Sequence, residues 1–226
     1  MKQTFGTIFT FLFLFGASAH AELVKSYFKT GELKAETHYV DGTNTKIKEG
    51  IKNGIEKTYY MEGTLAYKVN YINGKRDGEL VWFDKQGRKI AKMFYKNGKL
   101  DGDEIAYFPH NGKIKHIVKY VNDMKEGMQK EFYDNGQLAM EVPYVHNKKE
   151  GMQKEYTYDG KLYSEVLYKN NYKEGYQTWY DAKGNVTKKE LFKMDRPVNV
   201  MKEIEAKKEQ PGIEIKGIDF SPNKPK

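Results

Sequence analysis

The chain contains no cysteine, and this absence excludes several classes of protein. Without a thiol there is no lipobox residue for a lipoprotein anchor, no disulfide, no thiol catalysis and no thiolate metal site. Long apolar runs are also missing. The run over residues 8–15 is far shorter than the roughly 20 residues that span a bilayer, and no other stretch approaches that length. The sequence therefore predicts no transmembrane segment and a stability that comes from packing alone.

The first 21 residues have the pattern of a secretory signal peptide. Lys2 supplies a positive charge, residues 8–15 (IFTFLFLF) form an apolar segment, and Ala19-His20-Ala21 is an A-x-A cleavage pattern. We expect cleavage after Ala21, with a membrane anchor as the alternative. The mature chain would then be exported, either to a Gram-negative periplasm or by full secretion.

The charge balance is basic, with 39 Lys and Arg against 31 Asp and Glu and a net charge of +8. Such a balance suits an anionic partner, although a lysine-rich soluble surface is an equally simple explanation because the charges are spread along the chain. Export argues against nucleic acid as the partner. Hydrophobic residues make up only 38%, but 18 Tyr and 12 Phe supply large rings for a thin sheet.

Glycines and aromatic residues recur with a period of about 24 residues, which indicates about seven copies of one unit. One glycine set opens successive units, and a second set follows nine or ten residues later. Tyrosines recur eight residues after the second set. The repeat positions that we expect to be structural are Gly54, Gly78, Gly102, Gly127, Gly151, Gly175, Tyr71, Tyr95, Tyr120, Tyr144 and Tyr168.

Each unit is predicted to be a β-hairpin. A short strand such as residues 128–133 leads to a turn at Asp134-Asn135-Gly136, and a longer strand over residues 137–145 follows. The longer strand alternates, so that Leu138 and Val142 share one face while Glu141 lies on the other. Stacked hairpins bury a continuous stripe. The expected fold is all-β: an elongated, twisted antiparallel sheet.

The predicted organisation has three parts. Residues 1–21 are the signal peptide, residues 22–193 are the repeat domain, and residues 194–226 close the chain. An insertion over residues 41–53 makes the link between the first two copies irregular. Helical spacing over residues 198–210 predicts a short capping helix. The alternation over residues 213–220 is compatible with a further strand, and a basic tail follows.

The motifs Gly-Met-Gln-Lys-Glu-Tyr and Asp-Gly-Lys-Leu at residues 151–156 and 159–162 resemble those of MORN repeats, in their bacterial variant form. The resemblance covers nearly all of residues 22–193. It implies a module that binds or scaffolds rather than an enzyme. It further implies a relation to the YwqK-like antitoxins, which are immunity partners of secreted toxins.

A search for chemistry finds no catalytic residues, no metal ligands and no cofactor-binding motif. Ser164 lies outside any nucleophile-elbow pattern, and we interpret it as a packed residue. His116 is expected to be a partly buried, hydrogen-bonded histidine, although an enzyme would need it to meet a carboxylate. Asp101 and Asp103 offer too few oxygens for calcium. The acids of the Glu-Gly pairs, such as Glu150, are expected to be structural.

Two hypotheses of function remain. The first is a protein-binding module, and the resemblance sharpens it to an immunity-type protein that neutralises a toxin. Trp82 and Trp179 occupy equivalent repeat positions and would be its anchors if they lie on an open face; otherwise they pack between strands. The second is an envelope-associated scaffold that binds anionic lipid or polysaccharide through its lysines.

Overall fold

The computed structural model describes residues 22–40 and 50–199. The predicted signal peptide, most of the predicted insertion, and nearly all of the predicted capping helix, with the further strand and basic tail, lie outside these residues. Every regular element within the described part of the chain is a β-strand. The all-β prediction is therefore confirmed, whereas the short C-terminal helix remains a prediction.

The sheet contains 18 strands. The first nine are β1 (Glu22–Tyr27), β2 (Leu33–Val40), β3 (Ile51–Tyr59), β4 (Leu65–Ile72), β5 (Lys75–Phe83), β6 (Lys89–Lys96), β7 (Lys99–Leu100), β8 (Gly102–Tyr107) and β9 (Ile114–Val121). The others are β10 (Met124–Lys125), β11 (Gly127–Phe132), β12 (Leu138–Val145), β13 (Lys148–Lys149), β14 (Gly151–Tyr156), β15 (Leu162–Lys169), β16 (Tyr172–Tyr180), β17 (Val186–Lys193) and β18 (Arg196–Pro197).

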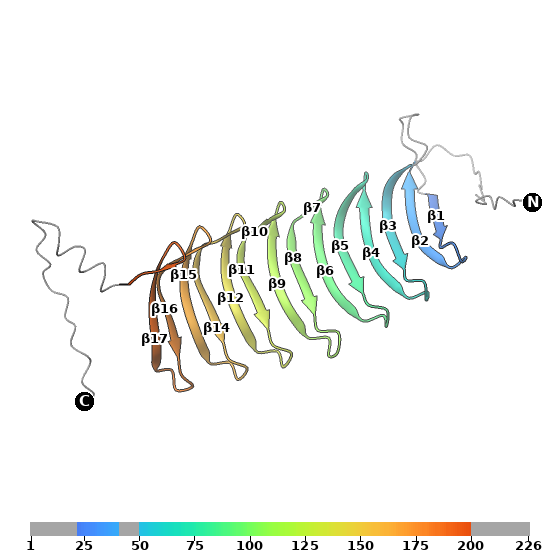
Figure 1. Cartoon of the computed structure of the whole chain (residues 1–226). Coiled ribbons are helices and arrows are strands. Elements are labelled where there is room, and N and C mark those ends of the chain that lie inside the picture. Colours follow the sequence, from blue (N-terminus) through green and yellow to red (C-terminus); the bar gives the residue numbers. More distant parts are fainter. Residues whose placement is uncertain (1–21, 41–49, 200–226) are drawn as a thin grey trace, which may run out of the picture.

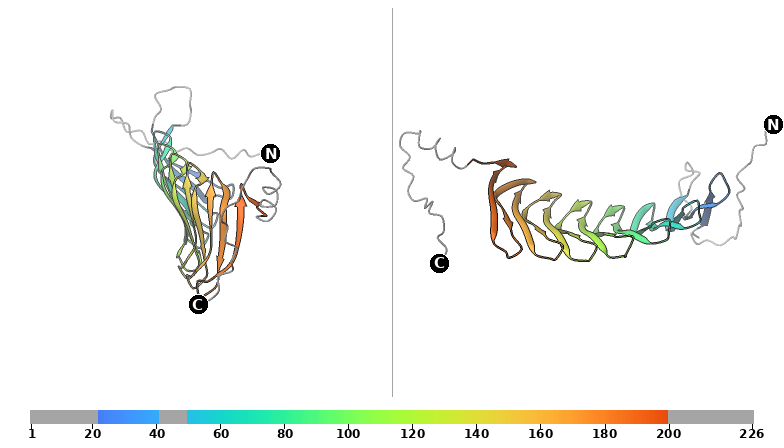
Figure 2. Two further views of the ribbon diagram at one scale, coloured as in Figure 1. Left: turned by 90° about the vertical axis from the view of Figure 1, so that its left-hand side faces the viewer. Right: turned by 60° about the horizontal axis from the view of Figure 1, so that its bottom comes forward.

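Each long strand pairs antiparallel with the next long strand in the chain, so the sheet is a meander (Figure 1). The two-residue strands β7, β10 and β13 lead directly into β8, β11 and β14. Figure 2 shows a single layer that twists along its length, with β1 and β17 at opposite ends. This elongated ribbon confirms the predicted stack of hairpins.

Two kinds of turn alternate along the two long sides of the ribbon. At the Asp134-Asn135-Gly136 turn, the Tyr133 N–H donates to the Gln137 carbonyl at 2.9 Å and Gly136 occupies the left-handed region. The links between units, which the sequence predicts only as polar turns, are also tight hairpins. His146 and Asn147 both have positive φ there, which is the backbone of a two-residue type I′ turn. Strand pairing thus continues through each of these links.

The links between units stack on one another. The Asn171 N–H donates to the Lys149 carbonyl at 3.0 Å, and the Lys149 N–H donates to Asn171 Oδ1 at 2.7 Å. Asn147 makes the same two bonds with Lys125, at 3.0 and 2.7 Å. Backbone groups that a chain reversal would leave without partners are therefore bonded to the neighbouring unit.

Burial is concentrated on one side of the sheet, which we call the inner face. Strand register aligns one residue of each long strand from β2 to β17 in a central inner row, which alternates between polar and apolar side chains from Glu104 to Gln177. Val69, Leu80, Val142 and Val166 in this row are almost fully buried. The inner row comprises Thr37, Glu56, Val69, Leu80, Met93, Glu104, Val118, Gln129, Val142, Gln153, Val166, Gln177 and Glu190.

Candidate functional site

Each glycine that opens a unit lies directly opposite an aromatic residue on the next strand, on the inner face. All six glycines have positive φ, a backbone conformation that glycine adopts at little steric cost. The pairs are Gly54 with Tyr71, Gly78 with Tyr95, Gly102 with Tyr120, Gly127 with Tyr144, Gly151 with Tyr168 and Gly175 with Phe192. The structure thus places these repeat residues within the sheet framework.

A cation lies over five of these six rings. The distances from the charged group to the ring centroid are 4.9 Å for Lys52 over Tyr71, 5.3 Å for Arg76 over Tyr95, 5.0 Å for Lys125 over Tyr144, 4.6 Å for Lys149 over Tyr168 and 4.9 Å for Lys173 over Phe192. The fourth unit has Leu100 at this position. Cation–π contacts of this kind stabilise partly desolvated sites.

The lysines among these cations also donate hydrogen bonds to other side chains of the inner face. Lys149 Nζ donates to Gln153 Oε1 at 3.1 Å, and Gln153 Nε2 donates to Glu155 Oε1 at 3.1 Å. Lys125 and Gln129 repeat the first contact at 3.1 Å. Burial, followed by repulsion from Lys173, lowers the pKa of Lys149. The inner lysines therefore belong to an internal polar network, which makes them poor candidates for binding an external anion.

Trp82 and Trp179 occupy the same inner-face row, as their repeat positions predict. Both are half-buried. The Trp82 ring packs on Tyr67 with a centroid distance of 4.7 Å, and Lys188 Nζ lies 4.5 Å from the Trp179 ring. Their indoles thus contribute to the inner face. Neither lies among the strongly exposed apolar side chains of the described residues.

His116 does meet a carboxylate on this face. Its Nε2 lies 3.7 Å from Glu104 Oε1, and its strand neighbour across the sheet is Glu131. The interaction with His116 lowers the pKa of Glu104. Ser164 lies two units away, is 1% exposed, and donates to Glu155 Oε2 at 2.9 Å. Serine and histidine are therefore held in separate networks.

The acidic residues that precede the unit glycines accept hydrogen bonds from backbone N–H groups of neighbouring turns. Glu150 Oε2 accepts the Asn170 N–H at 2.7 Å, and Glu126 Oε2 accepts the His146 N–H at 2.9 Å. Asp101 Oδ2 accepts the Asn122 N–H at 3.4 Å. Among the described residues, no three His, Cys, Asp or Glu side chains are grouped to hold a metal ion. The Glu-Gly pairs therefore tie each unit to the turn of the next.

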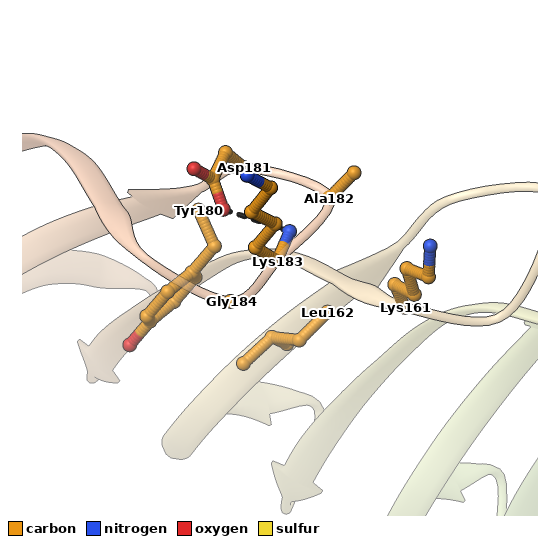
Figure 3. Close-up of a pocket in the computed structure, with 7 residues that line it drawn as sticks. All are labelled: Lys161, Leu162, Tyr180, Asp181, Ala182, Lys183 and Gly184. Carbon is orange, nitrogen blue, oxygen red and sulfur yellow. Dashed lines mark hydrogen bonds between the residues drawn. The ribbon is translucent and has the colours of Figure 1, made fainter.

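A shallow pocket of about 390 Å³ lies between the turns of the last two hairpins (Figure 3). Leu162 and Tyr180 form its apolar side, and Asp181, Lys183 and Gly184 come from the turn that follows β16. Both Asp181 oxygens already accept hydrogen bonds, Oδ1 from the Lys183 N–H at 2.8 Å and Oδ2 from Asn185 Nδ2 at 3.0 Å. The pocket brings together no pair of groups suited to acid–base chemistry.

The opposite side of the sheet, the outer face, carries a row of exposed apolar side chains. Strand pairing aligns Met128 with Pro143, Met152 with Leu167, and Tyr176 with Leu191. The register between units places the three pairs side by side across β11, β12, β14, β15, β16 and β17. We call these six residues the outer stripe. Met128, Met152, Leu167 and Tyr176 are 41%, 40%, 39% and 54% exposed.

The outer stripe is confined to the C-terminal half of the ribbon. The same row in the N-terminal half is mostly polar, with residues Ile55, Asn70, Glu79, Phe94, Asp103 and Lys119. Isolated exposed apolar residues are ordinary, but a contiguous row of them marks an interaction surface. The pattern within each strand does not predict this row, because its members are brought together only by the register between units.

A second row on the outer face contains Glu141 and Glu165, and tyrosine hydroxyl groups donate hydrogen bonds to both carboxylates. The Tyr156 hydroxyl donates to Glu141 Oε1 at 2.8 Å, and the Tyr180 hydroxyl donates to Glu165 Oε1 at 2.6 Å. Burial, followed by the hydrogen bond to Glu141, raises the pKa of Tyr156 to about 12. The two carboxylates are thus positioned before any partner arrives.

The raised tyrosine pKa values predict alkaline destabilisation. Tyr59, Tyr120 and Tyr156 each have a pKa of about 12 in the folded chain, against about 10 in an unfolded chain. A raised folded pKa contributes stability below the unfolded value, and this contribution is lost as pH rises from about 10 to 12. We expect denaturant midpoints to fall between about pH 10 and 12, and to fall less steeply for Tyr156→Phe. An equal slope in both proteins would contradict this assignment.

Comparison with protein families agrees with the repeat geometry. The MORN repeat variant matches five segments, residues 23–41, 52–73, 125–146, 149–170 and 173–194. No curated protein matches the sequence at a significant level. Within residues 22–40 and 50–199 there is no helix that is long and apolar enough to cross a membrane. MORN repeats are generally non-catalytic, and the five matches together with the stacked hairpins show that this chain is similar to MORN-repeat proteins.

Proposed function

We propose that this chain is an exported, non-catalytic repeat protein that binds a protein partner through its outer face. The observation that carries the proposal is the outer stripe. Met152 and Leu167 are paired on adjacent strands, and both are about two-fifths exposed, at 40% and 39%. Apolar and aromatic side chains held on a rigid surface are typical anchors of protein interfaces.

The inner face supports this choice of surface. Its cations, amides and carboxylates are bonded to one another, as in the network of Lys149, Gln153 and Glu155. A ligand on that face would have to replace existing bonds. The outer stripe requires no such exchange, because its side chains face solvent and gain by leaving water.

The resemblance to YwqK-like antitoxins supports a finer proposal. An immunity-type protein neutralises a toxin by covering it, which requires a broad, rigid surface and no catalytic group. Cleavage after Ala21 would deliver such a protein to the periplasm or the medium, where a secreted toxin acts. Export and toxin neutralisation rest on the sequence pattern of residues 1–21 and on this resemblance.

The test is a pull-down from native envelope extract with the mature chain, residues 22–226. We expect one stoichiometric protein that is retained in high salt and lost with Met152→Lys. Ile55→Lys is the matched control, because Ile55 is 48% exposed at the equivalent position of another unit but lies outside the stripe. Recovery of only salt-labile lipid or glycan would overturn the proposal and favour an envelope scaffold that binds anionic lipid or polysaccharide.

A further inference from the structure

A row of alternating charge runs beside the outer stripe. Lys130 pairs with Glu141 and Lys154 pairs with Glu165, and Glu141 also lies opposite Lys154 between the two units. The order across β11, β12, β14 and β15 is therefore plus, minus, plus, minus. Both rows lie on the same face, because residues two apart on a strand point the same way. We call these four residues the charged row.

When a row of alternating charges has an even number of members, reversing its order places each charge opposite a charge of the other sign. Consider a second copy whose outer face packs against the first, related to it by a two-fold axis parallel to the strands. This rotation reverses the order of the residues along each row. The charged row still faces the charged row, and the outer stripe still faces the outer stripe. Glu141 then faces Lys154 of the second copy, and Lys130 faces Glu165. In the stripe, Met128 faces Leu167 and Pro143 faces Met152. Within these four strands every charge meets its opposite and every apolar side chain meets another, while Tyr176 and Leu191 of the stripe lie beyond them.

We propose that the outer stripe and the charged row form a homodimer interface, in which two copies stack outer face to outer face across β11, β12, β14 and β15. The inference rests on the proposed function, since it assumes that the stripe binds protein. It names a second copy of this chain as the partner. Aligned packing of two sheets about 10 Å apart is a common arrangement. A toxin-type partner would then compete with the second copy for the same residues.

The dimer should be weak. Four strands spaced about 4.8 Å apart give the interface a length of about 14 Å. Two rows on such a patch bury less surface than the roughly 800 Å² per partner of a standard stable interface. We therefore expect dissociation in the roughly micromolar range, so that both monomer and dimer are populated at ordinary working concentrations.

The first measurement is sedimentation equilibrium of the mature chain over a concentration series around the micromolar range. The expected result is a reversible monomer–dimer equilibrium. Met152→Lys should weaken it about tenfold or more, because a charge enters the apolar row. Ile55→Lys should leave it unchanged. Melting curves of both variants establish that each remains folded.

The second measurement tests the register by exchanging charges. Glu141→Lys places like charges opposite one another at two symmetric positions, and so does Lys154→Glu. Each variant alone should dimerise roughly tenfold more weakly than the wild type. A mixture of the two should recover the association, since every reversed charge then faces its opposite. A purely structural effect of either substitution would not be rescued by mixing.

The outcomes separate this inference from the proposed function. A monomer at all concentrations that still captures a protein through Met152 overturns the homodimer and retains the protein-binding function. A dimer that is insensitive to Met152→Lys, or variants that mixing does not rescue, also overturns the interface. Failure of both self-association and capture overturns the two proposals together.

Discussion

Leu80→Ala is expected to lower the free energy of unfolding by about 3 kcal/mol, which is a typical cost for emptying a buried leucine site. Leu80 lies in the inner row between Val69 and Met93 and is only 1% exposed. Within residues 22–40 and 50–199 the sheet is a single layer (Figure 2), so these residues supply no second layer to close over the cavity. Because stability in a repeat array passes between neighbouring units, the loss should be visible in the denaturant unfolding of the whole chain.

Leu167→Ala is the matched control for this experiment. Leu167 lies on the outer stripe and is 39% exposed, so the same substitution there should cost less than about 1 kcal/mol. Equal losses at the two leucines would show that burial is not concentrated on the inner face. Both variants should be measured at a concentration below the dimer range, so that self-association does not contribute.

Gly151→Ala is expected to lower the free energy of unfolding by about 3–4 kcal/mol, although it adds a single methyl group. Its φ is +117°, where an L-residue is strained. An alanine Cβ would also lie 2.8 Å from Pro143 Cγ, a ring carbon that cannot rotate away. Urea unfolding of the mature chain measures the loss.

Gly175→Ala provides the comparison, because Gly175 has a φ of +83° and no atom lies within 4 Å of the position that an alanine methyl group would take. Only the backbone strain remains there, so the expected cost is about 1–2 kcal/mol. Combining Gly151→Ala with Pro143→Ala should remove the excess, since the clashing ring carbon is gone. A double variant that loses as much as the sum of its parts would refute the clash.

The sequence predicted the hairpin, its period and its inner residues well. Glycines at fixed spacing demand turns or bulges, and alternation within a strand, as at Leu138 and Val142, is a local property. The links between units were the missed element of the fold. His146-Asn147 lacks the Asn-Gly signature, and only the observed positive φ values show the type I′ turn.

The candidate surface could not be predicted in the same way. Met128, Pro143, Met152 and Leu167 are separated in the sequence by 9 to 15 residues, and their alignment depends on the register across units. The tryptophans stand out in the sequence because they are rare, with 2 in the chain. Trp82 packs on Tyr67 of the preceding unit, a neighbour that a single repeat does not reveal, whereas Trp179 lies beside Lys188 of its own hairpin.

The stacked links join successive repeats through the same kind of contact. The bonds between Asn171 and Lys149 repeat those between Asn147 and Lys125, and Asp123 with Leu100 and Asp195 with Lys173 make the same two contacts, so four successive links are bonded in the same way. The junctions Glu126-Gly127 and Glu150-Gly151 are chemically identical. Duplication or loss of a whole unit would therefore preserve every row of the sheet. The length of the ribbon and of its outer face can then change during evolution by one hairpin at a time.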